Sequence, residues 1–310
     1  MADKASRAIV LYADGFVPLI SVSHFHLHIL ASRASCSFLS LRDTPGSGKE
    51  EERVLRELAQ LLDVHDTYFP SKEELVDLDA HIQSQADVKL PTISERFMGM
   101  KAAILTTCPE VELFGRKLGF GVLSFDQLMD LPNAFSAATE LMQVLGFSGG
   151  KVLEKGEYDL VLVHVRTSEN AKDQLDWLNA LVGGIMQIAE PGSEVASRLH
   201  LSLVMSFGSV SETENQCSLC TLPQKHTNFA LSQLFPCQSY SMKGGHLLNN
   251  IRHHHPMLIA QWQEAVTRKD MVETFSFEDF EEHGGNLSIL ADRFLHEIAF
   301  KLWKTPKYGA

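Results

Sequence analysis

Short apolar runs that alternate with helical patterns constrain the fold of this chain more than any other feature. Each run is bounded by Gly, Asp, Ser or Pro, as is typical of strands buried on both faces of a parallel sheet. The runs are Ala8–Ala13, Cys36–Leu41, Ala102–Thr106, Leu160–Val165 and Leu201–Met205. The alternation predicts an α/β fold with a mainly parallel central sheet and helices on both of its faces.

The helical patterns lie between and after these runs. Acidic residues at the start of the first pattern complement the helix dipole, and a Pro at the first position of two others is typical of helix starts. The predicted helices are Lys49–Asp63, Ser71–Gln85, Pro109–Leu118, Ala134–Leu145, Ala171–Ala189, Pro256–Thr267 and Leu290–Lys304. We find no internal repeat and no strong linker, so residues 1–310 are expected to form a single domain with a helical C-terminal region at 246–310.

Charge, apolar runs and cysteine content limit the classes of binding partner and the cellular compartment that we expect. The 310 residues carry a net charge of −12, which opposes nucleic-acid binding because that function needs a positive face. The N-terminal apolar run is shorter than the ~7–15 residues of a signal peptide, and no window reaches the ~20 apolar residues of a membrane span. Five cysteines, an odd number, do not suggest a disulfide framework. We expect a cytoplasmic or nuclear protein with neither nucleic acid nor membrane as partner.

Polar side chains follow the strand-like runs, at the end where ligands bind in open α/β sheets. Asp14 follows the first run, and Gly15 after it allows the backbone to turn sharply. His164 ends another run, and Glu169 and Asp173 follow it, four residues apart, at a helix start. Carboxylates and imidazoles ligate divalent cations, so these residues are candidate metal ligands. The alternatives are a plain Asp-Gly turn and a solvated helix start.

A later polar loop carries further candidate ligands. His226 lies in it as a candidate metal ligand, and Cys217 and Cys220 form a CxxC pair followed by Cys237. Thiolates and an imidazole can complete a tetrahedral structural zinc site. The alternative is a set of ordinary loop thiols, because an isolated CxxC is a weak signal.

Five segments in a fixed order carry a family resemblance. They are the strand that ends in Asp14 and Gly15, then GMKAAILTTCPEVELFGRKLGF, YDLVLVHVRTSENAKD, LHLSLVMSFGS and KHTNFALSQLFP. Together they resemble the cofactor-independent phosphoglycerate mutase family of the alkaline-phosphatase superfamily, nearest to its archaeal-type branch. The resemblance implies an alkaline-phosphatase-like fold that holds two divalent metals. It also implies that the family's inserted substrate-binding domain is shortened here to residues 43–95.

The resemblance assigns roles to single residues. Asp14 matches the family's first metal-binding Asp, and His226 matches its last metal-binding His. The family's Asp-x-x-x-His falls on Glu169 and Asp173, where both side chains are carboxylates. These four residues could hold one divalent metal, zinc or manganese.

The family's Asp-His pair after the next strand falls on Ser206 and Phe207, and a phenylalanine cannot ligate a metal. The nucleophilic Ser or Thr has no match; Ser21, Ser23 and Ser47 are candidates by position only. Loss of ligands and nucleophile favours a catalytically degenerate protein, a pseudoenzyme that binds a protein partner or a phosphorylated small molecule. The alternative is a metal-dependent phosphotransferase or phosphohydrolase with an altered metal site.

Histidines elsewhere decide between these alternatives. The enzyme interpretation is favoured if His24, His26, His28 or His164 supplies the metal ligand that is missing at Phe207. The alternate histidines of the HFHLH segment would share one face if that segment were a strand.

Overall fold

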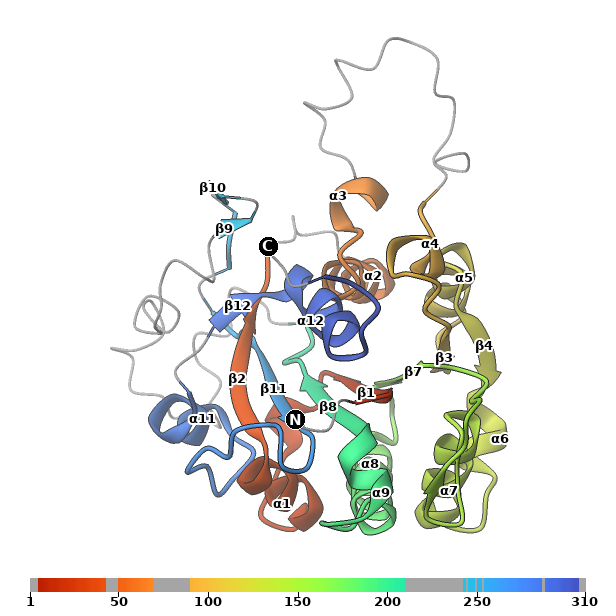
Figure 1. The fold of residues 1–310 in the computed structure, drawn as a ribbon. Coiled ribbons are helices and arrows are strands. Elements are labelled where there is room, and N and C mark those ends of the chain that lie inside the picture. The colour runs from red at the N-terminus through yellow and green to blue at the C-terminus, as the bar shows by residue number, and fades with distance from the viewer. Residues whose placement is uncertain are drawn as a thin grey trace.

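An eight-stranded sheet forms the centre of the computed structural model (Figure 1). The strand order is β12-β2-β11-β8-β1-β7-β3-β4, and neighbours run parallel except where β11 pairs antiparallel with β2 and β8. The structure describes residues 5–42, 50–69, 90–209, 242–243, 245–248, 250–252, 254–285 and 288–306.

The strands of this sheet are short and follow the apolar runs of the sequence. Their bounds are β1 Arg7–Asp14, β2 Ser35–Ser40, β3 Ala102–Thr106, β4 Gly121–Ser124, β7 Leu160–Arg166, β8 Leu199–Met205, β11 Met257–Trp262 and β12 Ser288–Leu290. In β1, Ile9 and Leu11 join one hydrophobic core while Val10 and Tyr12 join the other. Because successive side chains of a strand point to opposite faces, a strand buried on both faces needs a continuous apolar run.

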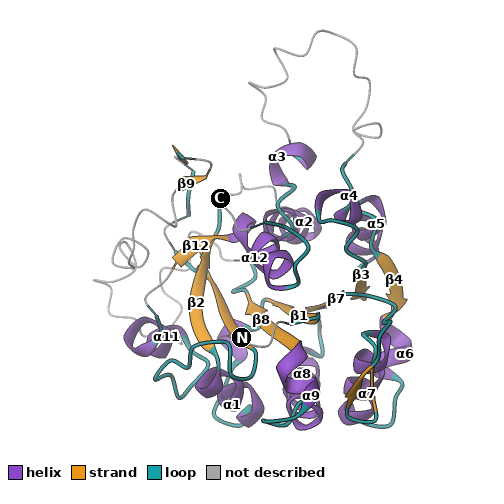
Figure 2. Ribbon diagram, viewed as in Figure 1, coloured by secondary structure: helices purple, strands orange, loops and turns teal. Residues whose placement is uncertain are grey.

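Helices cover both faces of the sheet (Figure 2). The core on one face takes side chains from α1 Phe25–Arg33, α6 Phe125–Met129, α7 Ala134–Val144, α8 Ala171–Ile188, α9 Glu194–Arg198 and α11 Phe277–His283. The core on the other face takes them from α2 Glu50–Leu61, α4 Ile93–Arg96, α5 Pro109–Lys117 and α12 Phe294–Lys301. The mainly parallel sheet with helices on both faces agrees with the predicted fold class.

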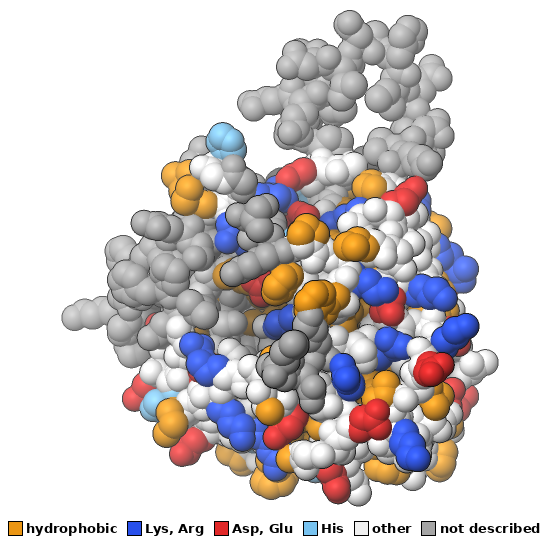
Figure 3. Space-filling view, in the orientation of Figure 1, with side chains coloured by type: hydrophobic (Ala, Val, Ile, Leu, Met, Phe, Trp, Pro, Cys, Tyr) orange, Lys and Arg blue, Asp and Glu red, His pale blue; other side chains and the backbone are white. Residues whose placement is uncertain are grey.

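Smaller elements complete the described structure. They are α3 His65–Tyr68, the 3-10 turns η1 Val17–Leu19 and η2 Ala291–Arg293, and two short hairpins, β5 Phe147–Ser148 with β6 Lys151–Val152 and β9 Met242–Lys243 with β10 His246–Leu247. Within the described residues, no helix is both long and apolar enough to cross a membrane. On the face seen in Figure 3, basic and acidic side chains are interspersed.

One predicted element is wrong, and one condition tested at the histidines is not met. The helix predicted at Pro256–Thr267 is strand β11, which is almost wholly buried between two antiparallel neighbours. Its apolar run is short enough to suit either structure, and Pro256 was a misleading helix signal. The segment around His24, His26 and His28 begins helix α1, with His24 at the N-cap, so the three alternate histidines do not line one face as they would in a strand. The predicted helix Ser71–Gln85 lies outside the described residues.

Candidate functional site at the carboxyl ends of the central strands

Asp14 ends the central strand β1 with a fully buried carboxylate. Nη2 of Arg53, from helix α2, donates to Oδ1 at 2.9 Å and to Oδ2 at 2.8 Å. Oγ of Ser206, directly after β8, donates to Oδ1 at 2.8 Å. The carboxylate therefore has a cation and a hydroxyl donor from the chain itself, as a buried charge requires.

The turn after β1 is built for close backbone approach. Gly15 has φ +85°, and a Cβ there would lie 2.8 Å from Oγ1 of Thr167 and 3.6 Å from Cα of Gly208. Oγ of Ser206 accepts from the N–H of Gly15 at 3.0 Å and of Gly208 at 3.3 Å. Ser206 thus joins the ends of β1 and β8. In the Asp-Gly pair, Gly15 makes the turn and Asp14 forms the ion pair with Arg53.

Arg53 also holds a second buried carboxylate, that of Glu57 one turn later on α2. Nη1 of Arg53 donates to Glu57 Oε2 at 2.8 Å, the hydroxyl of Tyr12 donates to the same oxygen at 3.2 Å, and Nη1 of Arg252 lies 3.5 Å from Oε1. Burial raises the pKa of Glu57, although Arg252 and Arg53 oppose this rise. Burial lowers the pKa of Arg53, but its carboxylate partners, above all Glu50, raise it overall, so its guanidinium stays charged.

His164 lies beside this network with one ring nitrogen unpaired. Its Nδ1 is 2.8 Å from Oγ1 of Thr106 on the adjacent strand, and its ring stacks on Tyr12 at 5.3 Å between centroids. Nε2 is buried and has no hydrogen-bond partner among the described residues. Burial lowers the pKa of His164 to about 4, so the imidazole is neutral near pH 7.

The described charges around Asp14 nearly cancel. The set holds four carboxylates and three guanidinium groups, which leaves a formal charge of −1. The carboxylates are Asp14, Glu50, Glu51 and Glu57, and the cations are Arg53, Arg166 and Arg252. The described residues at this edge of the sheet therefore form no cationic surface that would attract a phosphate dianion.

The other sequence candidates lie apart from Asp14 or outside the described residues. Glu169 in the loop and Asp173 in the first turn of α8 are both exposed. The ring of Phe207 packs edge-on against His255 at 4.6 Å between centroids. His226, Cys217, Cys220, Cys237 and Ser47 lie outside the described residues.

The histidines of α1 serve local contacts. Nε2 of His24 lies 3.4 Å from Asp176, and its Nδ1 accepts from the N–H of Ser21 at 2.9 Å. Nδ1 of His28 accepts from the N–H of Phe275 at 3.0 Å. Within the part of the chain that the structure describes, we find no contact between these histidines and Asp14. They do not fill the gap at Phe207.

The described residues do not fit a divalent metal at Asp14. Among them, no three His, Cys, Asp or Glu side chains come together as a metal site. A divalent cation about 4 Å from the Arg53 guanidinium would be repelled by roughly 8 kcal/mol at an effective dielectric constant of about 20. Both oxygens of Asp14 already accept from Arg53, and Oδ1 also accepts from Ser206, so the lone pairs that a metal would need are engaged.

Arg53 and Glu57 are the important residues that sequence reasoning missed. Their spacing with Glu50, at i, i+3 and i+7, places them on one face of α2. A charged stripe of this kind normally indicates a solvated helix face. The pairing with Asp14 spans 39 residues, and only the tertiary fold reveals it.

Comparisons with known proteins identify the fold. No protein-family model matches the sequence, and no curated protein matches it. The PH0037 protein from Pyrococcus horikoshii is similar in structure, with a TM-score of 0.56 and 10% identity over 100% of both chains. Cofactor-independent phosphoglycerate mutase from Thermoplasma acidophilum has a TM-score of 0.54 and 11% identity, over 96% of this chain and 100% of that chain. The resemblance stated from the sequence is confirmed at the level of the fold, which this chain shares with a cofactor-independent phosphoglycerate mutase.

Proposed function

We propose that this chain, which has the alkaline-phosphatase-like fold of cofactor-independent phosphoglycerate mutase, is a non-catalytic binding or scaffold protein. The observation that carries the proposal is the Arg53 guanidinium, which donates to both oxygens of Asp14. In phosphoryl transfer, two metals neutralise the attacking and leaving oxygens of the reacting phosphate. Here the carboxylate expected to hold a metal is neutralised by the chain itself.

The geometry of Arg53 supports a permanent arrangement. Arginine is always charged in proteins, and its flat fork of donors suits carboxylates. Arg53 is anchored at both ends of its fork, by Asp14 on one side and Glu57 on the other. A metal at Asp14 would have to displace this guanidinium, which Glu50 and Glu57 hold in place beside it.

The charge balance favours a protein partner over a phosphorylated small molecule. The formal charge of −1 around Asp14 gives a phosphate group no net attraction. Of the cations there, Arg166 is the one with the weakest pairing, because its Nη2 is 3.8 Å from Glu51. A phosphorylated ligand would have to use it.

Metal dependence of stability is the test. Wild type, Asp14→Asn and the exposed-residue control Asp130→Asn would be stripped with a chelator and melted with and without Mn²⁺ or Zn²⁺. We expect the wild-type melting temperature to be unchanged by either metal, and no turnover of 3-phosphoglycerate or p-nitrophenyl phosphate. Asp14→Asn should lower the melting temperature equally in all conditions.

The opposite result has a defined meaning. Metal that raises the wild-type melting temperature but not that of Asp14→Asn, together with turnover, would establish the alternative enzyme. That enzyme would be a metal-dependent phosphotransferase or phosphohydrolase using Asp14, Glu169, Asp173 and His226. Bound zinc would be measured by mass spectrometry in a further variant, Cys217→Ser. Zinc that is lost only in this variant would indicate a structural zinc site with Cys220 and Cys237.

Calorimetric titration tests the partner class, with 3-phosphoglycerate as the probe. We expect no saturable heat. If 3-phosphoglycerate bound saturably to wild type and not to Arg166→Met, the proposed partner would be a phosphorylated small molecule and not a protein.

A further inference from the structure

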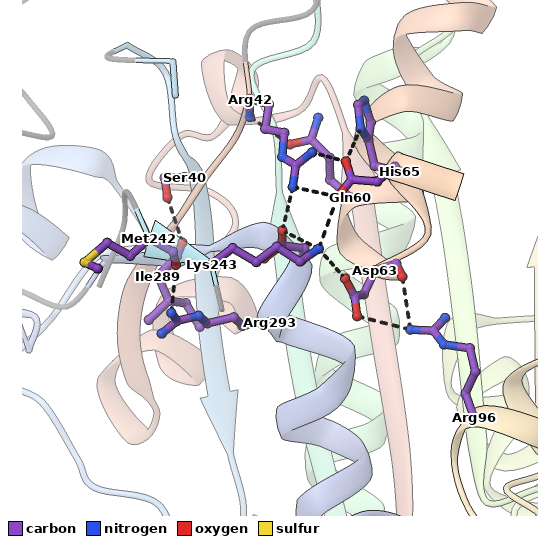
Figure 4. Close-up of polar contacts among 12 residues, drawn as sticks. Ser40, Arg42, Gln60, Asp63, His65, Arg96, Met242, Lys243, Ile289 and Arg293 are labelled. Atoms are coloured by element: carbon purple, nitrogen blue, oxygen red, sulfur yellow. Dashed lines mark hydrogen bonds and ion pairs between the residues drawn. The ribbon is translucent and has the colours of Figure 1, made fainter. Parts of the chain in front are cut away.

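A second charge cluster lies away from Asp14, where the β9–β10 hairpin meets the end of α2 (Figure 4). Nζ of Lys243, on β9, is 2.8 Å from Asp63 Oδ1, 3.1 Å from Asp292 Oδ2 and 3.6 Å from Asp66 Oδ2. Asp63 and Asp66 flank the start of α3, and Asp292 lies in η2. One ammonium thus contacts three carboxylates from two separate segments, which we call the socket.

The socket is held together without Lys243. Arg42 pairs with Asp66 and with Asp292, the latter at 3.2 Å, and its backbone N–H donates to Gln60 at 2.8 Å. Arg96 donates to the backbone oxygen of Leu62 at 2.7 Å and lies 3.4 Å from Asp63. These arginines belong to the body of the molecule, so the carboxylates keep their positions if the hairpin leaves.

The described residues of the hairpin bury few apolar side chains against the rest of the domain. None of the described residues between 242 and 248 is buried, and Leu247 is 65% exposed. Within the described residues, the side chain of Arg293 also holds the hairpin, because it donates to the backbone oxygen of Met242 at 2.8 Å. Leu248 packs only partly against the core. Segments with few buried apolar contacts are the ones that open locally.

We propose that the β9–β10 hairpin is a flap latched by ion pairs, with Lys243 as the latch and Asp63, Asp66 and Asp292 as its socket. Figure 1 places the hairpin at the edge of the molecule, beyond β12. With Lys243 in place, the three carboxylates meet three cations, and without it the socket carries a net −1. Release of the hairpin therefore exposes an acidic socket on the body of the domain.

The charge states keep the latch closed near neutral pH. Burial lowers the pKa of Lys243, but Asp63 and Asp292 raise it overall. Hydrogen bonds from His65 and Arg42, against the effect of burial, lower the pKa of Asp66. Arg42 and Arg96 are the arginines that pair with the socket carboxylates, whereas Arg293 contacts the hairpin backbone at Met242.

Hydrogen–deuterium exchange of the whole chain tests the latch. The variants would be Lys243→Gln, the charge-preserving Lys243→Arg, and Lys172→Gln as a control on the exposed surface of α8. We expect Lys243→Gln to speed exchange of the hairpin by about tenfold or more, because it removes a partly buried charge from its partners. Exchange in β1, β7 and α8 should stay at the wild-type rate, and the other two variants should match wild type.

Salt gives a second measurement that needs no variant. Because ions screen partly exposed pairs, added NaCl should speed exchange of the wild-type hairpin while leaving the central strands unchanged. Hairpin exchange that neither salt nor Lys243→Gln alters would overturn the proposal. Equal acceleration of hairpin and central strands would do the same, since it would mean that Lys243 supports the whole fold.

Discussion

Replacing Arg53 by methionine is expected to destabilise the fold far more than loss of a surface ion pair, because two buried carboxylates lose their partner. Asp14 is 0% exposed and Glu57 is 1% exposed. Arg53 donates to Asp14 at 2.8 and 2.9 Å and to Glu57 at 2.8 Å. Removing one member of a buried pair costs about 3–5 kcal/mol. Since Arg252 still faces Glu57 and Ser206 still donates to Asp14, we expect the lower end of that range, about 3 kcal/mol.

A double variant separates the ion pair from the loss of packing. Asp14→Asn removes the charge but keeps an acceptor oxygen for Ser206. If the charge of Asp14 is what Arg53 neutralises, the two substitutions together should cost about 1–3 kcal/mol less than the sum of the single effects. Simple loss of arginine packing would leave the effects additive.

Urea denaturation followed by tryptophan fluorescence, to which the buried Trp262 contributes, would measure these free energies of unfolding. Arg116→Met is the matched control, because Arg116 pairs with Glu112 on the exposed surface of α5 at 2.7 Å. Its cost should be within about 0.5 kcal/mol. An Arg53→Met variant as stable as Arg116→Met would refute the buried pair between β1 and α2, and with it the main support for a non-catalytic protein.

Three further predictions follow from the same edge of the sheet. Burial lowers the pKa of His164 from 6.5 to about 4, so between these values the unfolded chain binds a proton that the folded chain does not. Wild-type stability should therefore fall by up to roughly 3 kcal/mol as the pH drops through this window, and urea titrations of His164→Gln across it should show a shallower fall. Ser206→Ala should cost about 1–3 kcal/mol in the same assay, because buried Asp14 loses a donor and two glycine N–H groups lose an acceptor; a change below the Arg116→Met control would contradict this. Gly15→Ala should lower the melting temperature, because φ is +85° and the new Cβ would meet Thr167 at 2.8 Å, whereas Gly192→Ala, with φ +83° and open space around it, should lower it less.

The fold was largely readable from the sequence, because burial on both faces of a strand forces a continuous apolar run. Such runs located β1, β3, β7 and β8 to within two residues of their bounds. β11 escaped because its run is also short and apolar, and a short apolar run after a proline suits a helix start equally well. Distinguishing the two requires knowing what lies on either side, which is tertiary information.

The candidate site was readable only where local sequence sets it. Asp14 was found because a carboxylate directly after a buried strand, followed by glycine, has a restricted set of roles. Arg53 was not found, because a charged helix face has the same local pattern whether it faces water or a buried carboxylate. Glu57 shows the same difficulty: it is 1% exposed, yet nothing in its neighbourhood along the chain distinguishes it from a surface glutamate.

Arg53 is part of the chain, whereas a metal can dissociate. This difference decides which measurement distinguishes a non-catalytic protein from a metal-dependent enzyme. A metal neutralises a carboxylate only in proportion to its concentration and affinity, so a fold that relies on one loses stability when a chelator is added. A guanidinium fixed on α2 is always present at its partner, and the stability it provides cannot depend on a chelator. Absence of turnover is weaker support for a non-catalytic protein, since a wrong substrate gives the same result. Stability that is indifferent to a chelator, sensitive to Arg53→Met and non-additive with Asp14→Asn comes from the internal pair.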